Sequence, residues 1–190
     1  EWWGLVGVGR AHKPGSACWA ASVYRLHLLM EDLTPNIGQM WYFFTEVFSD
    51  FRPFFRFVMH ALCGLFALPM ALRFPQRPVL LATAQCLILC LFKPYPSVAD
   101  HVLYMGLLPL LQKQLGHLQS GMLLVNSFLL LAVLEPAMWH QWINIESANS
   151  NFYYSITLLL GAWQVLLLVI LLQLTVQVER IEKGKPQALA

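Results

Sequence analysis

The residues with the most distinctive chemistry form a polar stretch, Asn144-Ile-Glu-Ser-Ala-Asn-Ser-Asn151, which leads directly into a long apolar run. Amide and hydroxyl groups both donate and accept hydrogen bonds, so such side chains at the mouth of a membrane helix could recognise a polar head group. The same residue types often cap helices, and Asn149 or Ser150 could serve only in that role. The residues alone therefore do not decide between ligand contact and helix capping.

No catalytic constellation accompanies this stretch. His60 lies in an apolar run without an acid at helical spacing, so an interhelical hydrogen bond explains it better than catalysis. Asp100 and His101 are neighbours that would point apart on a helix, and Asp100 is expected to pair with Lys93. Glu135, at the end of an apolar run, is expected to reach water. We therefore predict no catalytic residue in this chain.

Metal and nucleic-acid sites are not indicated either. Three of the four cysteines, Cys63, Cys86 and Cys90, lie in apolar runs where a thiol usually packs as a small hydrophobe. Cys86 and Cys90 share a helix face, but no further ligands stand at metal-binding spacing. The 12 Lys and Arg residues are dispersed and the net charge is only +2. We therefore predict no metal, no cofactor and no nucleic-acid partner.

The elements that carry these residues belong to a membrane protein. Hydrophobic residues make up 58% of the chain and charged residues only 12%, a composition too apolar for an ordinary soluble domain of 190 residues. Residues 152–176 contain no charged side chain. At ~1.5 Å rise per residue this run reaches ~37 Å, enough to cross a bilayer with some tilt. The sequence predicts an all-α, polytopic helical bundle.

The predicted organisation follows the apolar runs along the chain. Residues 1–30 are expected to be irregular, and residues 36–52 to form an aromatic-rich helix that either lies at the bilayer interface or packs against other helices. The predicted spans are residues 54–72, 78–92, 98–111, 118–134 and 152–176, followed by a cytosolic tail at 181–190. Gly106 and Pro109 interrupt the third of these, which either crosses as a distorted span or re-enters.

The basic residues predict the orientation of these spans, because Lys and Arg in short loops favour the cytosol. Those assigned to the cytosolic side are Arg73, Arg77, Lys113, Arg180, Lys183 and Lys185, whereas residues 135–154 contain no Lys or Arg. These assignments are consistent only if the chain crosses the membrane five times. Residues 31–53, 93–100 and 135–151 are then expected to share the non-cytosolic face, which is the condition for a common site.

Five motifs occur in order along the chain, namely Asp32-Leu-Thr-Pro-Asn-Ile-Gly38, Trp41-Tyr-Phe-Phe44, Lys93-x-Tyr95-Pro96-x-x-x-Asp100-x-x-Leu103-Tyr104-Met105, Trp139-His140-x-Trp142-Ile143 and Ser147-Ala-Asn-Ser-Asn151-Phe. Together they resemble the PIG-U family, the U subunit of the glycosylphosphatidylinositol (GPI) transamidase. The resemblance covers residues 31–180 and corresponds to the C-terminal part of a longer family member. Residues 1–30 do not look like the family.

The resemblance implies a complex in the endoplasmic reticulum membrane that cleaves a C-terminal signal from a precursor protein and joins the new carboxyl group to GPI. It implies a non-catalytic subunit that holds the GPI glycolipid among membrane lipids, with a fold like that of the GT-C-type lipid-linked mannosyltransferases. The nucleophile is expected on the thiol-protease subunit PIG-K. The other expected partners are PIG-T, PIG-S and the GPI-anchor attachment subunit.

On this reading, Asn149 and Asn151 are expected to hydrogen-bond the glycan or phosphate of GPI. The further candidates for GPI contact are Ser147, Trp139 and His140 beside them, and Asn36 and Tyr95 from the other loops. Two alternatives come from other classes. A glycosyltransferase of lipid-linked sugars would draw on Glu46 or Asp50, and a transporter would draw on the broken segment 102–111, although no internal repeat supports transport.

Overall fold

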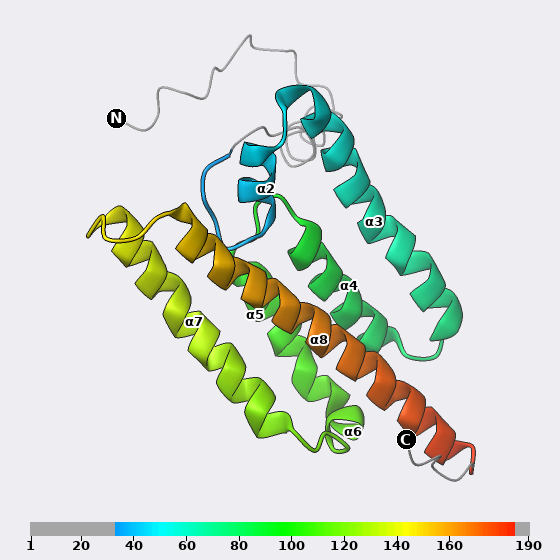
Figure 1. The fold of residues 1–190 in the computed structure, drawn as a ribbon. Helices are drawn as coiled ribbons and strands as arrows, with labels where there is room; N and C mark the ends of the chain where they lie inside the picture. The colour runs from blue at the N-terminus through cyan, green and yellow to red at the C-terminus, as the bar shows by residue number, and fades with distance from the viewer. Residues whose placement is uncertain (1–32, 185–190) are drawn as a thin grey trace, which may run out of the picture. The chain divides into compact units, whose positions relative to one another are not determined.

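The computed structural model describes residues 33–184 (Figure 1), so the predicted irregular segment 1–30 and tail residues 185–190 lie outside the described residues. All regular secondary structure in residues 33–184 is helical, which confirms the all-α prediction. The elements are α2 (Met40–Glu46), η1 (Ser49–Phe51), α3 (Arg52–Arg73), α4 (Pro78–Phe92), α5 (Val98–Leu107), η2 (Leu108–Leu111), α6 (Gln112–Leu115), α7 (Gly121–Ile143) and α8 (Ser150–Glu182).

Three stretches in this part of the chain are long and apolar enough to cross a membrane, namely Ser49–Arg73, Gly121–Ile143 and Ser150–Glu182. Pro78–Phe92 is apolar but shorter, at 15 residues. The chain is therefore a membrane protein, while the prediction of five crossings and the GT-C-like architecture stay predictions. α8 packs against α4, α6 and α7 and buries side chains such as Leu167 and Leu171. α3 and α7 expose most of their apolar side chains.

α8 extends beyond the predicted span of 152–176. It continues as helix to Glu182, because residues 177–182 contain no helix breaker and two ion pairs hold them against the α3–α4 connection. Arg73 Nη1 lies 3.0 Å from Glu179 Oε2, and Arg77 pairs with Glu182. The first two residues of the predicted tail therefore belong to the helix.

The predicted continuous segment 36–52 is wrong, because it is divided in two. α2 ends at Glu46, the chain is extended at Val47 and Phe48, and the short 3₁₀ turn η1 leads into α3. Pro53 cannot continue a preceding helix, but it is well suited to the first turn of a new one. Arg52 Nε donates to Val47 O at 3.3 Å, which satisfies a carbonyl freed at the break.

The predicted end of the fourth span at residue 134 is also wrong. α7 continues through Pro136 to Ile143, although proline removes a hydrogen bond in a helix interior, since membrane helices tolerate such a loss. Trp139 and His140 therefore lie on the last turns of α7 and not in a loop. The helix begins at Gly121, three residues later than expected.

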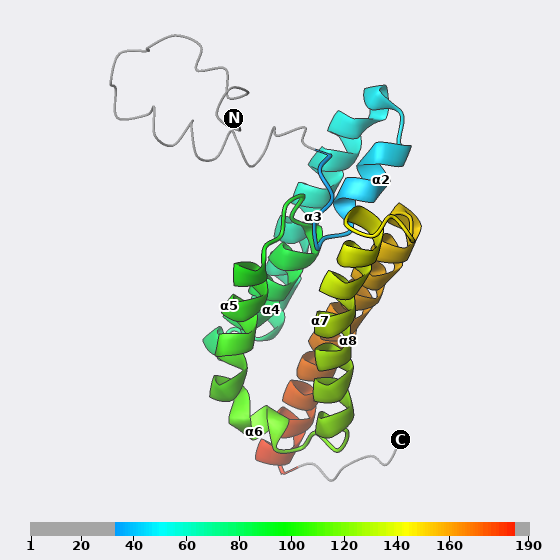
Figure 2. The same cartoon turned by 90° about the vertical axis from the view of Figure 1, so that its left-hand side faces the viewer.

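The structure of residues 98–115 favours a distorted crossing of the membrane over a re-entrant segment. α5, η2 and α6 follow one another from the connection at residues 93–97 to the opposite end of the bundle, where α6 packs against α8 (Figure 2). Pro109 lies in η2, where the regular helix gives way to a 3₁₀ turn. The segment therefore follows the length of its neighbours.

Candidate functional site

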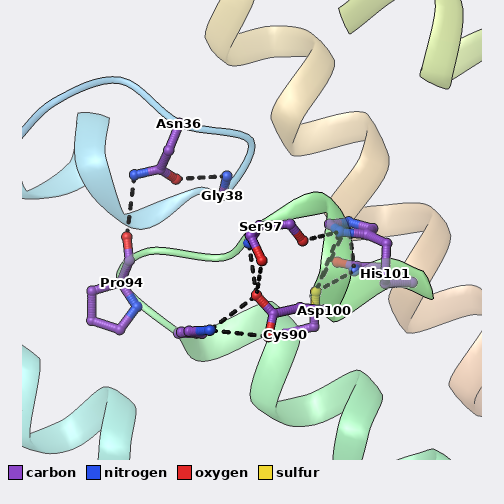
Figure 3. Close-up of polar contacts among 9 residues, drawn as sticks. Asn36, Gly38, Cys90, Pro94, Ser97, Asp100 and His101 are labelled. Atoms are coloured by element: carbon purple, nitrogen blue, oxygen red, sulfur yellow. Dashed lines mark hydrogen bonds and ion pairs between the residues drawn. The ribbon is translucent and has the colours of Figure 1, made fainter. Parts of the chain in front are cut away.

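Two of the predicted non-cytosolic loops meet directly at one end of the bundle (Figure 3). Asn36 Nδ2 donates to Pro94 O at 3.3 Å, and Asn36 Oδ1 accepts a hydrogen bond from Gly38 N at 2.8 Å. Tyr95 OH donates to Thr34 O at 3.3 Å. Asn36 and Tyr95, both predicted to contact GPI, thus join residues 33–39 to residues 93–97.

Two glycines permit residues 33–39 to approach the 93–97 connection and α8 closely. A Cβ atom on Gly38 would lie 2.5 Å from Pro96 Cγ, and one on Gly161 of α8 would lie 1.4 Å from Gln39 Nε2. Real Cβ atoms essentially never come within 3.0 Å of other heavy atoms, so a side chain at Gly38 would strike the rigid Pro96 ring, whereas one at Gly161 would displace the flexible end of Gln39. The loop is therefore packed between the 93–97 connection and α8.

The 93–97 connection is itself held to α5, as predicted. Lys93 Nζ lies 3.0 Å from both carboxylate oxygens of Asp100. Asp100 Oδ2 also accepts hydrogen bonds from the backbone N and Oγ of Ser97, at 2.7 and 2.9 Å, in a capping box that begins the helix (Figure 3). Asp100 therefore has a structural role, which confirms the expected pairing with Lys93.

An aromatic cluster joins α2 to the adjacent ends of α7 and α8. Its members are Trp41, Tyr42, Trp139, Trp142, Tyr153 and Tyr154. Trp41 stacks on Trp142 with ring centroids 6.1 Å apart, and Tyr42 stacks on Tyr154 at 4.4 Å. Trp41 Nε1 is buried without a hydrogen-bond partner in the described structure. The prediction that the three loop regions share one end is thus confirmed for the described residues (Figures 1 and 2).

The polar residues beside this cluster divide into two groups. Asn149 is the N-cap of α8, and its Oδ1 accepts a hydrogen bond from Asn151 N at 3.0 Å, so its capping role is confirmed. Ser147 Oγ donates to Gln141 Oε1 at 2.5 Å and closes the loop after α7. These two side chains have structural partners within their own loop.

Asn151 and His140 form the second group, and both are exposed. Asn151 is exposed, its Oδ1 accepts a hydrogen bond from Tyr42 OH, and its Nδ2 donates to no residue within 33–184. His140 is exposed on the last turns of α7, with Nδ1 2.6 Å from Asn144 Nδ2. Trp139 packs edge-on against Tyr153, with ring centroids 5.1 Å apart. The structure therefore places Asn151 and Trp139 at one aromatic cluster.

Sequence reasoning missed a second polar group, which lies inside the bundle. Gln164 Nε2 of α8 lies 3.3 Å from Cys90 Sγ of α4, 3.2 Å from His101 Nε2 and 3.4 Å from Tyr104 OH, both of α5. Four buried side chains thus hydrogen-bond to one another and tie three helices together, and Figure 3 labels two of them, Cys90 and His101. The described residues contain no group of three or more His, Cys, Asp or Glu side chains that could hold a metal ion.

Two further polar residues differ from expectation. His60 Nδ1 lies 2.7 Å from Arg56 O in its own helix, so the predicted interhelical hydrogen bond is wrong; one turn of helix already offers a carbonyl at that distance. Glu135 Oε1 accepts a hydrogen bond from Tyr153 OH at 2.6 Å and links α7 to α8, so it does not simply reach into water. Glu46 and Asp50 are exposed around the break between α2 and α3.

Comparisons with known proteins give a consistent result. The model of the family described as PIG-U, GPI transamidase subunit PIG-U, matches residues 4–160. The expectation that residues 1–30 lie outside the resemblance is therefore wrong for residues 4–30. The matched range also ends before residue 180, where we expected the resemblance to end.

Three relatives illustrate the similarity. The human GPI-anchor transamidase component PIGU is 37% identical over 147 residues, covering 77% of this chain and 34% of the relative. The GAB1 homolog of Schizosaccharomyces pombe, a GPI transamidase component, is 39% identical over 138 residues, covering 73% and 34%. The GAB1 component of Saccharomyces cerevisiae is 36% identical over 151 residues, covering 76% and 37%. The chain spans about a third of the length of these curated relatives.

Proposed function

Because this chain belongs to the PIG-U family of GPI transamidase subunits, we propose that it is part of a non-catalytic subunit that holds the GPI glycolipid for the transamidase in the endoplasmic reticulum membrane. The polar and aromatic end of the bundle is the proposed contact surface. Amide transfer to the amine of GPI requires both substrates to be held together, and positioning alone can supply ~7–11 kcal/mol of such a barrier. A subunit without a nucleophile could contribute in this way.

The observation that carries the proposal is the position of Asn151. Its amide is exposed beside the aromatic cluster, with one oxygen already fixed by Tyr42 and an amino group free of described partners. An amide oriented in this way can donate to a sugar hydroxyl or a phosphate. Tyr and Trp rings near the bilayer surface suit the boundary between a lipid tail and a hydrated head group.

The remaining partners follow from the family. We propose that catalysis belongs to PIG-K and that PIG-T, PIG-S and the GPI-anchor attachment subunit complete the complex. The apolar side chains exposed on α3 and α7 are suited to membrane lipid or to helices of these subunits. The glycosyltransferase alternative is not favoured, since the matched relatives carry transamidase names.

The experiment replaces Asn151 by leucine in the full-length protein, expressed as the only copy in cells. The backbone N of residue 151 keeps its hydrogen bond to Asn149, so the start of α8 is retained. We expect GPI-protein display, measured by flow cytometry, to fall while the variant still co-purifies with its partners. Loss of a hydrogen bond to a charged group corresponds to affinity about tenfold weaker or more.

Two control variants sharpen this test. Asn126→Leu makes the same change at an exposed position in the first half of α7 and should leave display unchanged. Tyr42→Phe removes only the hydrogen bond that orients Asn151, so its effect should be smaller. Normal display with Asn151→Leu as the sole copy would rule out an essential contact.

A further inference from the structure

A separate pocket lies at the opposite end of the bundle, between the start of α4 and the segment formed by η2 and α6. It has a volume of about 260 Å³ and is lined by residues 76–80 and 110–114. Figures 1 and 2 show the α3–α4 connection, α6 and the last turns of α8 together at this end, away from α2. The pocket is therefore distinct from the aromatic cluster.

The lining carries positive charge and no acidic residue. Arg77 lies on one wall and forms an ion pair with Glu182. Lys113 lies on the other wall, is exposed and forms no ion pair with any residue in 33–184. Because one cation has no counterion in the described structure, the pocket favours an anion.

The first turn of α4 adds hydrogen-bond donors. The N-cap residue Arg77 makes no side-chain capping bond, and the first N–H groups of a helix have no partner within it. Val79 and Leu80 are in this turn, and both line the pocket. The positive end of the helix dipole therefore lies beside Lys113.

The strongest indication of a ligand is Gln114. The residue is only 5% exposed, it lines the pocket, and its side-chain amide makes no hydrogen bond to any described residue. The residue as a whole is buried, but its amide atoms are not among the fully enclosed unpaired atoms of the described residues, so the amide is open to the pocket and free to hydrogen-bond an occupant. An occupant with hydrogen-bonding oxygens would satisfy this amide.

We propose that this pocket binds a phosphate group. A phosphate offers several oxygens to donors that converge from different directions, which here are an ammonium, a guanidinium, a helix N-terminus and an amide. The apolar part of the lining, at Val79, Leu80, Leu110 and Leu111, would suit the first methylene groups of the acyl chains of a phospholipid. Arg180, which is exposed at the same end, is suited to an anionic membrane surface.

The test uses the full-length protein purified in neutral detergent, with binding measured by native mass spectrometry. The probes are dioctanoyl phosphatidic acid, inorganic phosphate, and dioctanoylglycerol, which lacks the phosphate. We expect phosphatidic acid to bind and dioctanoylglycerol not to bind. Competition by millimolar inorganic phosphate would identify the free anion as sufficient, and lack of competition would identify the lipid head group as the ligand.

Matched variants locate the binding. Lys113→Gln should weaken phosphatidic acid binding about fivefold, the contribution of one basic residue near a membrane surface. Lys183→Gln removes the same charge from the end of α8, outside the pocket lining, and should change binding less than twofold. Gln114→Leu should weaken binding without lowering the melting temperature, because it removes an amide that has no described partner.

The proposal would be overturned by equal binding of phosphatidic acid and dioctanoylglycerol, or by equal effects of Lys113→Gln and Lys183→Gln. It would also be overturned if Gln114→Leu lowered the melting temperature and left binding unchanged, since the amide would then be structural. None of these outcomes bears on the aromatic cluster, because the two sites lie at opposite ends of the bundle.

Discussion

Replacing Gly38 by alanine is expected to disturb the packing that holds residues 33–39 against the 93–97 connection. The new Cβ would lie 2.5 Å from Pro96 Cγ, 2.7 Å from Pro96 Cδ and 2.9 Å from Asn36 Oδ1. Carbon atoms pack best about 3.5–4.0 Å apart, so the overlap is about 1 Å. The proline ring cannot rotate away, and one of the two loops must move.

The magnitude follows from these contacts. Overpacking of this kind typically costs about 1–3 kcal/mol. Movement of the loop would also strain the 2.8 Å hydrogen bond from Gly38 N to Asn36 Oδ1, which is worth about 1 kcal/mol. We therefore expect the free energy of unfolding to fall by about 2–4 kcal/mol.

The assay is thermal unfolding of the full-length protein in detergent, where a lower free energy of unfolding appears as a lower melting temperature. Gly106→Ala in α5 is the matched control, because nothing lies within 4 Å of a Cβ built there. Alanine is favoured over glycine in a helix by about 0.5–1 kcal/mol, so this control should be neutral or stabilising. Gly38→Ala is thus expected to be destabilising, whereas Gly106→Ala is not.

A double-mutant cycle tests the cause. Pro96→Ala removes the Cγ and Cδ atoms that the new methyl group would strike, so Gly38→Ala should cost at least about 1 kcal/mol less in that background. If Gly38→Ala were no more destabilising than Gly106→Ala, or equally costly with and without Pro96, the close packing of these loops would not exist as described.

Two further predictions concern polar contacts, each measured by thermal unfolding in detergent. Asp100→Ala removes the capping box and the ion pair together and should cost about 1–2 kcal/mol, whereas Lys93→Met, which removes only a partly exposed ion pair, should cost less than about 1 kcal/mol; equal costs would contradict the importance of the cap. Gln164→Leu should cost about 1–3 kcal/mol, because it leaves His101 Nε2 without its α8 partner. Gln173→Leu, at an exposed position of the same helix, is its control and should be nearly neutral.

Local features of the sequence were sufficient to predict much of the architecture. The charge-free run at 152–176 predicted a spanning helix because its length and composition alone suit hydrocarbon. The Lys93–Asp100 pair was also predictable, since its partners are seven residues apart across one turn. Helix ends were predicted less well: Pro136 suggested a boundary, but neighbouring contacts such as that of Glu135 with Tyr153 stabilise α7 beyond it.

The sequence by itself determined that the chain is an all-α membrane protein of the PIG-U family, and that amide and aromatic residues flank its last helix. Only the tertiary structure decided that Asn149 caps this helix while Asn151 faces Tyr42, 109 residues away. It also decided that Gln164 joins Cys90 and His101, and that Gln114 lines a pocket with Arg77. Apart from the local Asn149 cap, such contacts depend on how helices pack side by side, and the period of one helix shows which face is apolar but not which residue of another helix lies against it.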